Sequence, residues 1–150
     1  MLDAGRIRTL IPHQGAMCLL EAAVGWNRRA IVCRARSHLA PDNPLRQAGR
    51  LGAACGIEYG LQAAALHGAL VAMEAGAPAL PPGRFAALRR AELFVARLDD
   101  PAYGTLSVVA LQERAEPAGL IYAFRLRAAG GRLLLRGRAS VMLGAAGYAG

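Results

Sequence analysis

The sequence predicts an α+β fold in which one antiparallel sheet curls around a single long helix. Residues 51–73 form an apolar stretch of helical length without proline. Segments in which apolar and polar side chains alternate with a period of two, as in β-strands, lie on both sides of it. At 150 residues the chain fits one domain, spanning residues 1–150, with a core of ordinary size.

The segments before the helix are predicted to form a short amphipathic start over residues 1–15, then two strands and a loop. The strands cover residues 17–26 and 29–37, with a turn at residues 27–28. Residues 38–50 follow and contain two prolines, which favours an irregular connection to the helix.

The segments after the helix are predicted to form four strands. Proline and glycine in residues 75–83 end the helix. Period-two alternation then marks strands over residues 88–97, 103–113, 120–128 and 132–143. Because short turns separate them, we expect consecutive strands to pair as an antiparallel meander. Two strands, a helix and four strands give one sheet of about six strands wrapped around the helix.

The helix carries a seam of small residues and one formally charged side chain, Glu58. The seam repeats every four residues and consists of Gly52, Gly56, Gly60, Ala64 and Gly68. Each glycine lowers helix propensity by about 1 kcal/mol relative to alanine. So many glycines indicate that other elements approach the helix closely. Glu58 would then be one carboxylate in an apolar setting, where burial is expected to favour its protonated form.

Two other interpretations of this helix stay open. A stretch of this length could span a membrane, and small residues spaced by four occur in transmembrane dimers. A carboxylate near its middle, together with Gln62 and His67, makes burial in lipid costly. The helix could also be a plain core helix whose Glu58 reaches solvent or a structural partner.

The composition narrows the classes of partner. Eighteen basic residues, all arginine, face ten acidic ones, which gives a formal charge of +8. Such a charge attracts acidic partners. There is no basic run interleaved with aromatic residues and no recognisable nucleic-acid module, so we expect an acidic protein and not nucleic acid.

The cysteines indicate neither a metal site nor a disulfide framework. Cys18, Cys33 and Cys55 are odd in number and lack the CxxC spacing. The first residues do not have the pattern of a secretory signal. We therefore expect a cytoplasmic protein without a bound metal.

Several short motifs resemble the hotdog-fold β-hydroxyacyl-acyl carrier protein dehydratases. Residues 10–13 and 17–21 resemble the LPHR-x-P-x-LLxDR opening of that family, and residues 57–62, IEYGLQ, resemble its E-x-x-x-Q helix motif. The likeness is closest to the divergent dehydratase-like proteins of aryl-polyene type pigment synthesis. Residues 44–51 and 56–68 are similar to the PLR-x-x-GRL and GIEYxxQAxAxHG segments of that branch. The resemblance covers most of the chain and implies the hotdog fold.

The resemblance implies a lyase that removes water from a 3-hydroxyacyl thioester on acyl carrier protein, in fatty-acid, polyketide or polyene biosynthesis. A base takes the proton at C2, an acid protonates the departing hydroxyl, and a helix N-terminus stabilises the thioester oxygen. Glu58 matches the catalytic carboxylate of the family. We expect Cys55 and Gly56, at the helix start, to contact the substrate. Gln62, one turn after Glu58, is expected to contact the substrate or to orient the carboxylate. No cofactor is implied.

The loop histidine of the family has no direct counterpart. Counted back from the helix carboxylate, its place falls on Pro44 or Asn43, and the only histidine of this loop is His38. Either a remodelled loop brings His38 to the site as the base, or Asn43 stands there and positions a water or a carbonyl. His13 matches a family histidine that we expect to be structural, and His67 is expected to be a satisfied helix residue.

Three functions stay open. The first is a dehydratase or reversible hydratase, with an apolar tunnel beside the helix at a dimer interface. The second is a catalytically reduced partner subunit of a heterodimeric dehydratase, and the third is an acyl thioesterase. Whether the chain forms a homodimer or a heterodimer is equally open. The acidic carrier protein would meet surface arginines in a salt-sensitive encounter, with Arg46, Arg50, Arg89 and Arg90 as candidates.

Overall fold

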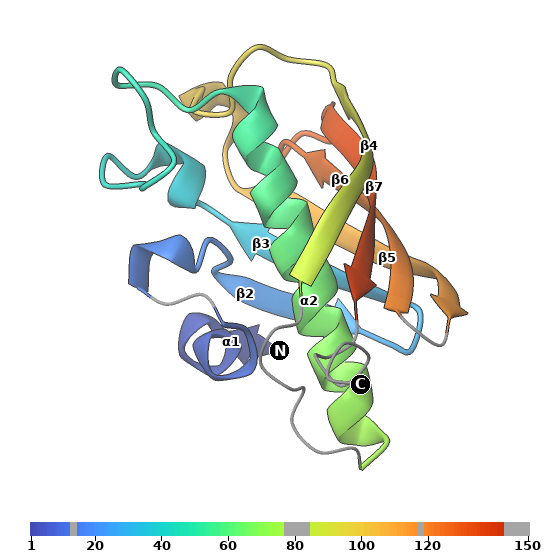
Figure 1. The fold of residues 1–150 in the computed structure, drawn as a ribbon. Helices are drawn as coiled ribbons and strands as arrows, with labels where there is room; N and C mark the ends of the chain where they lie inside the picture. The colour runs from blue at the N-terminus through green and yellow to red at the C-terminus, as the bar shows by residue number, and fades with distance from the viewer. Residues whose placement is uncertain (13–14, 77–84, 117–118, 143–150) are drawn as a thin grey trace.

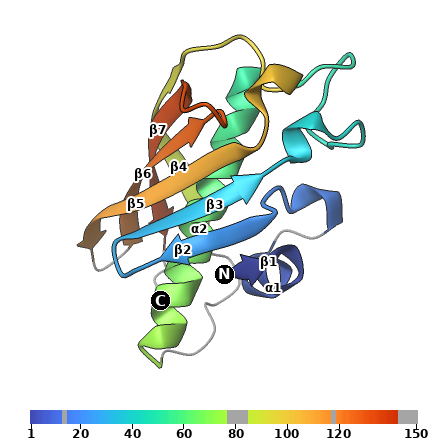
Figure 2. The same cartoon turned by 180° about the vertical axis from the view of Figure 1, so that it is seen from behind.

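The architecture is a seven-stranded antiparallel sheet wrapped around one long helix, α2 (Gly56–Glu74) (Figures 1 and 2). The computed structural model describes residues 1–12, 15–76, 85–116 and 119–142. The helix crosses the concave face of the sheet, with α1 (Ala4–Leu10) beside it near the N-terminal edge. This confirms the predicted α+β class.

The strands are short before the helix and longer after it. Four 3₁₀ turns, at Gly15–Met17, Ser37–Leu39, Ala53–Cys55 and Pro101–Tyr103, lie in the connections. The strands are β1 (Leu2–Asp3), β2 (Ala22–Trp26), β3 (Ala30–Ala35), β4 (Phe85–Leu93), β5 (Leu106–Glu116), β6 (Gly119–Arg127) and β7 (Leu133–Met142).

The order of strands in the sheet is β1-β2-β3-β5-β6-β7-β4. The predicted meander is therefore correct for β5, β6 and β7 and wrong for β4, which pairs with β7 at the far edge, Leu93 opposite Leu135. The connection from β4 to β5 is long enough to pass the start of the helix. There Ala53 N–H donates to the Ala96 carbonyl and Leu98 N–H donates to that of Leu51.

The long helix begins later than predicted. Residues 51 and 52 are taken up by contacts with the β4–β5 connection, and a 3₁₀ turn follows at Ala53–Cys55. The α-helix proper starts at Gly56, so Glu58 lies in its first turn and not near its middle.

Two glycines of the small-residue seam let the helix touch the sheet. A Cβ atom on Gly60 would lie 2.2 Å from the Phe124 ring, and one on Gly56 would lie 2.3 Å from Leu135 Cδ2. A Cβ on Gly52 would meet nothing within 4 Å. The close approach predicted from the glycines is thus confirmed at Gly56 and Gly60.

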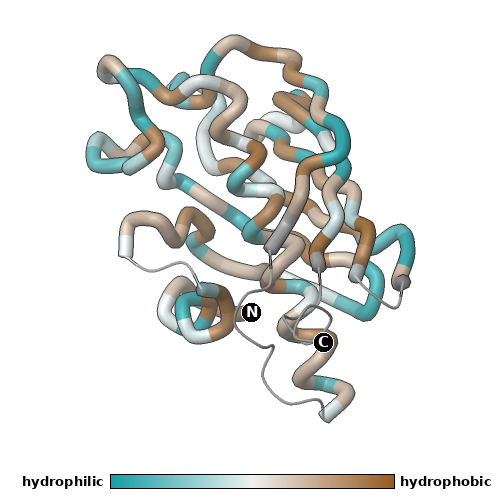
Figure 3. Tube along the Cα trace, viewed as in Figure 1, coloured by the Kyte–Doolittle hydropathy of each residue, from teal (hydrophilic) through white to brown (hydrophobic). Residues whose placement is uncertain are grey.

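The core lies between α2 and the inner face of the sheet. Its largest fully buried side chains include Tyr59, Leu66, Tyr122, Phe124 and Leu126. Apolar colouring follows α2 and the strands, whereas much of the loop between β3 and α2 is hydrophilic (Figure 3). Over the ranges that the structure describes, no helix has the length and apolarity that a membrane crossing needs.

Candidate functional site

Glu58 lies on the part of α2 that this chain leaves incompletely covered. Ile57, Glu58, Leu61 and Ala65 are half-buried, whereas most of the intervening residues are buried. Within the described ranges no hydrogen bond or ion pair engages the Glu58 carboxylate. The side chain sits in the first turn of α2, where the helix dipole gives a positive potential. A carboxyl group here is thus available to a molecule outside this chain.

Cys55 and Gly56 form the entry to the helix. Gly56 is fully enclosed by Leu98, Leu126 and Leu135, so its missing side chain is what allows the helix start to pack on the sheet. The half-buried Cys55 Sγ lies 3.6 Å from the Leu45 carbonyl oxygen. Burial raises the pKa of the Cys55 thiol, which keeps it protonated and favours a packing role over a nucleophilic one.

Gln62 is fully buried and binds the backbone of the N-terminal segment. Its Nε2 donates to the Met17 carbonyl at 2.6 Å, and its Oε1 accepts from Leu19 N–H at 2.9 Å. These bonds go to the backbone, whereas the sequence led us to expect Gln62 to orient Glu58 or touch substrate. Gln62 therefore fastens the segment before β2 to the helix.

Asn43 joins the loop before the helix to Tyr59, the neighbour of Glu58. Its Nδ2 donates both to the Ser37 carbonyl at 2.9 Å and to Tyr59 Oη at 3.2 Å. Its Oδ1 accepts from Leu45 N–H at 2.9 Å. Since both amide hydrogens have partners inside the protein, Asn43 holds the loop in place and has no free N–H to offer a substrate.

His38 lies in the 3₁₀ turn Ser37–Leu39, at the start of the loop before α2. The residue is fully inaccessible, and neither ring nitrogen has a hydrogen-bond partner among the described residues. Burial lowers the pKa of the ring, and the Gly104 backbone and the Asp99 carboxylate lie near it. No described hydrogen bond joins His38 to Glu58 within this chain.

An ion-pair cluster holds the base of the same loop. Arg46 Nη1 lies 2.9 Å from Asp99 Oδ2, and Arg97 Nε lies 2.7 Å from Asp99 Oδ1. Arg46 also donates to the carbonyls of Ala40 and His38. These arginines hold the pKa of the Asp99 carboxyl well below its usual range. The sequence does not reveal this cluster, because Asp99 meets Arg46 only through the fold.

The four arginines proposed to meet a carrier protein are in different situations. The Arg46 side chain is only 17% exposed and is committed to Asp99. Arg89 donates through Nε to Ser140 Oγ, and Arg90 lies 3.6 Å from Glu92. Arg50 is exposed in the loop near the helix start.

His67 is a satisfied core residue, as predicted. Its Nδ1 lies 2.7 Å from Tyr122 Oη and its Nε2 lies 2.7 Å from the Asn27 carbonyl oxygen. The carbonyl can only accept, so Nε2 carries the proton and Nδ1 of the neutral ring accepts from Tyr122. His13 lies outside the described residues.

The structure forms a groove that Glu58 does not line. It has a volume of about 420 Å³ and is lined by residues of β4 to β7 such as Val109, Arg125 and Arg138. Their neighbours along the strands, Val108 and Leu126 among them, are buried on the side of α2. The groove thus lies on the outer face of the sheet. In the portion of the chain described here, no three His, Cys, Asp or Glu side chains cluster as metal ligands would.

Comparison with solved structures gives the fold its relatives. The chain is similar to a protein of the dehydratase heterocomplex ApeI:P from Xenorhabdus doucetiae, with a TM-score of 0.79 at 17% identity over 96% of this chain and 92% of that one. AziG from S. sahachiroi is similar with a TM-score of 0.62 at 17% sequence identity, over 89% of this chain and 98% of that one. A hypothetical thioesterase with coenzyme A from Streptococcus pneumoniae TIGR4 is similar with a TM-score of 0.56 at 10% sequence identity, over 82% of this chain and 84% of that one. These likenesses establish the hotdog fold.

Sequence comparison identifies the family. No curated protein matches the chain. The family model of the ApeP-like proteins, described as ApeP dehydratase, matches residues 5–145, which is nearly the whole sequence. The match agrees with the resemblance of the helix motif around Glu58 to dehydratase-like proteins. The chain is a dehydratase-like hotdog protein and belongs to the ApeP-like family.

Proposed function

We propose that this protein is the acid-bearing subunit of a two-subunit dehydratase that acts on 3-hydroxyacyl thioesters carried by acyl carrier protein. The observation that supports this most strongly is the difference in solvent exposure between the Glu58 and His38 side chains. Glu58 is half-buried and unengaged within the described ranges, whereas the ring of the loop histidine is fully enclosed and has no hydrogen-bond partner there. Among the residues that the structure describes, no histidine is hydrogen-bonded to the Glu58 carboxylate.

In the proposed reaction a base from the second subunit takes the proton at C2 of the acyl chain. Glu58 gives its proton to the departing 3-hydroxyl, so that water leaves and a double bond forms between C2 and C3. The positive end of the α2 dipole stabilises the negative charge that develops on the thioester oxygen. The carboxylate is then reprotonated by the proton taken from C2, which restores both groups.

The free edge of β4 is the surface that we propose the second subunit covers. β4 is the last strand of the sheet among the described residues, and within them one row of its backbone N–H and C=O groups has no strand partner. Leu93 pairs with the buried Leu135, yet 45% of its own surface is exposed, and Phe94 is 46% exposed. The chain just after β4 lies against residues 51–53, next to the first turn of α2. A subunit along this edge would therefore reach Glu58.

The comparisons support a two-subunit arrangement by analogy. The similar structure from Xenorhabdus doucetiae is named as a dehydratase heterocomplex. A carrier protein that delivers the acyl chain to Glu58 would pass the exposed Arg50, and added salt should weaken that encounter.

The test measures enoyl product from 3-hydroxyacyl-acyl carrier protein by mass spectrometry. We expect little turnover by the purified chain alone and strong turnover when an ApeI-type hotdog subunit is added. In the mixture, Glu58→Gln should lower the rate by about 10² to 10⁴, the usual contribution of a general acid. The matched control is Glu74→Gln at the other end of α2, which should leave the rate unchanged.

Two outcomes would reject the proposal. Full turnover by the Glu58→Gln mixture would show that the acid lies elsewhere. Release of the free carrier thiol without an enoyl product would indicate a thioesterase instead.

A further inference from the structure

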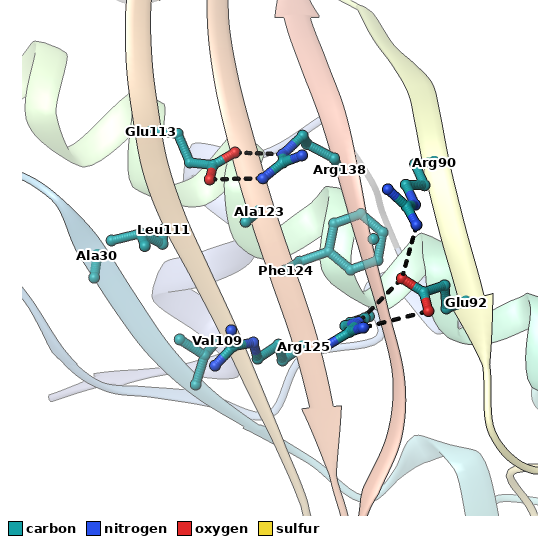
Figure 4. Close-up of a pocket in the computed structure, with 12 residues that line it drawn as sticks. Ala30, Arg90, Glu92, Val109, Leu111, Glu113, Ala123, Phe124, Arg125 and Arg138 are labelled. Carbon is teal, nitrogen blue, oxygen red and sulfur yellow. Dashed lines mark hydrogen bonds and ion pairs between the residues drawn. The ribbon is translucent and has the colours of Figure 1, made fainter.

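The outer face of the sheet carries a groove with one apolar half and one arginine-rich half (Figure 4). Strand pairing arranges its lining in cross-strand rows. One row joins Val109, Arg125, Arg136 and Glu92, and the next joins Leu111, Ala123, Arg138 and Arg90. The larger apolar side chains of the lining, Val109 and Leu111, come from β5 beside β3, and its arginines come from β6, β7 and β4. Glu113 of β5 reaches across to the arginines through its ion pair with Arg138.

The apolar half exposes large side chains on a surface that the helix does not cover. Val32 on β3 is 38% exposed and Leu111 on β5 is 42% exposed. Val32 pairs directly with Val109, and Leu111 pairs with Ala30 and Ala123. These residues form one continuous apolar strip beside the arginines, and such a strip is typical of a surface that binds a partner.

The charged half contains more arginine than its glutamates balance. Arg138 Nε lies 2.6 Å from Glu113 Oε1, and Arg136 Nε lies 3.1 Å from Glu92 Oε1. Glu92 also forms an ion pair with Arg90. Two glutamates thus face four arginines, which leaves an excess of two positive charges in the groove.

Arg125 is the one of these four arginines that takes no part in the ion pairs just described. It is exposed, pairs across the sheet with Arg136, and has no marked interaction with the other lining residues drawn in Figure 4. Like charges directly opposite each other on neighbouring strands are destabilising. A carboxylate placed between Arg125 and Arg136 would relieve that repulsion.

We infer that this groove docks an acidic amphipathic helix of a partner protein. Its apolar stripe would lie on Val109 and Leu111, and its carboxylates would meet Arg125 and Arg136. A helix with side chains is about 10 Å wide. Two strand spacings, about 10 Å, separate β5 from β7. One helix thus spans the boundary between the two halves.

The charge of the groove discriminates between occupants. A second copy of this chain would bring its own formal charge of +8 toward a face with excess positive charge, and would be repelled. The glutamates and the apolar strip make the face poorly suited to a nucleic-acid backbone. An acidic helix satisfies both halves at once. The groove lies on the side of the sheet away from Glu58, so this inference stands or falls independently of the dehydratase proposal.

The experiment uses a stapled helical peptide of about 18 residues, long enough to hold a helix, with a leucine stripe flanked by glutamates. Its binding to the full chain is followed by fluorescence anisotropy at low and high salt. We expect salt-sensitive binding that Arg125→Glu weakens by about tenfold or more and that Leu111→Ser also weakens. Arg28→Glu, the same charge change at an exposed position in the β2–β3 turn, should bind as the wild type does.

Three results would overturn the inference. The first is that the Arg125→Glu and Arg28→Glu proteins bind the peptide equally well. The second is that a peptide with lysine in place of glutamate binds as tightly as the acidic peptide, and the third is that the chain self-associates and Arg125→Glu abolishes this self-association. Thermal melts of each variant separate loss of binding from loss of folding, since both substituted arginines are exposed.

Discussion

The side-chain amide of Asn43 donates to the hydroxyl of Tyr59 at 3.2 Å, which fastens the loop before α2 to the neighbour of Glu58. The hydroxyl lies 2.8 Å from Ser37 Oγ, and Ser37 Oγ in turn donates to the Leu19 carbonyl. The serine proton is used on Leu19, so Tyr59 must donate to Ser37 and accept from Asn43. One tyrosine therefore joins the loop and the segment before β2 to the start of α2.

Removal of this hydroxyl should destabilise the protein measurably. In Tyr59→Phe, Asn43 loses an acceptor and Ser37 loses a donor inside the core, and each unsatisfied buried group costs about 1–3 kcal/mol. Urea unfolding measures the change. Tyr103→Phe is the control, because its half-buried ring stacks on Arg132 and should lose less than about 0.5 kcal/mol. Equal stability of the two variants would mean that the network contributes nothing.

The contact of Gly60 with Phe124 predicts a steric limit on the helix. In Gly60→Ala the new methyl group would enter the Phe124 ring at 2.2 Å. Overpacking of this kind costs about 1–3 kcal/mol, and the better helix propensity of alanine returns only about 1 kcal/mol. We expect a lower melting temperature. Gly52→Ala is the matched control, since its Cβ has open space and its φ of −67° suits alanine. If Gly60→Ala melted no lower than Gly52→Ala, the packing of α2 on β6 would be looser than described.

The sequence predicted the layers of this fold because periodicity reports which face of an element is buried. Leu106, Val108 and Ala110 lie two residues apart on one face of β5, and all three are fully buried in the core. Periodicity does not report which strand lies next to which. The placement of β4 beside β7 depends on the path of residues 94–105 past the helix start, and no local pattern encodes that path.

The candidate site was predictable only where a residue's role is local. Glu58 was found as the one charged residue of an apolar helix, and it is half-buried at the helix start. The environments of His38 and Asn43 depend on partners that the fold brings in. His38 was considered as a base brought in by a remodelled loop, and the structure encloses its ring near Asp99. Sequence spacing cannot foresee a contact between residues so far apart in the chain.

Loss of the Gln62 amide should loosen the segment before β2. Gln62→Met keeps the length of the side chain but leaves the Met17 carbonyl and the Leu19 N–H without their partner. We expect a loss of about 2 kcal/mol or more, given the cost of buried unsatisfied groups. Hydrogen exchange followed by mass spectrometry should show faster exchange in the peptide that contains Leu19. Gln47→Met, at an exposed loop position, should change neither quantity. Unchanged exchange at Leu19 would contradict the assigned role of Gln62.

Burial of two histidines should make stability fall in mildly acidic solution. His67 and His38 are both fully buried, and burial lowers the pKa of each ring below the unfolded value of about 6.5. Below pH 6.5 the unfolded chain therefore binds more protons than the folded one. The free energy of unfolding is then expected to be at its full value above pH 6.5 and to decrease as the pH falls from there, by at most about 1.4 kcal/mol per pH unit for each histidine.

Urea unfolding at pH 7.5, 6.5 and 5.5, for the wild type and for His67→Gln, measures this dependence. Glutamine is less stable in that place at every pH, because it cannot satisfy both Tyr122 and Asn27 as the ring does. Its stability should nevertheless change less between pH 6.5 and 5.5, since one titrating group is gone. Asp99 should not affect this comparison. Because its pKa is depressed in the folded protein, its contribution to the free energy of unfolding is complete above the ordinary carboxyl range near pH 4 and is lost only below it. Parallel curves for the two proteins would show that His67 does not titrate between the folded and unfolded states as its burial requires.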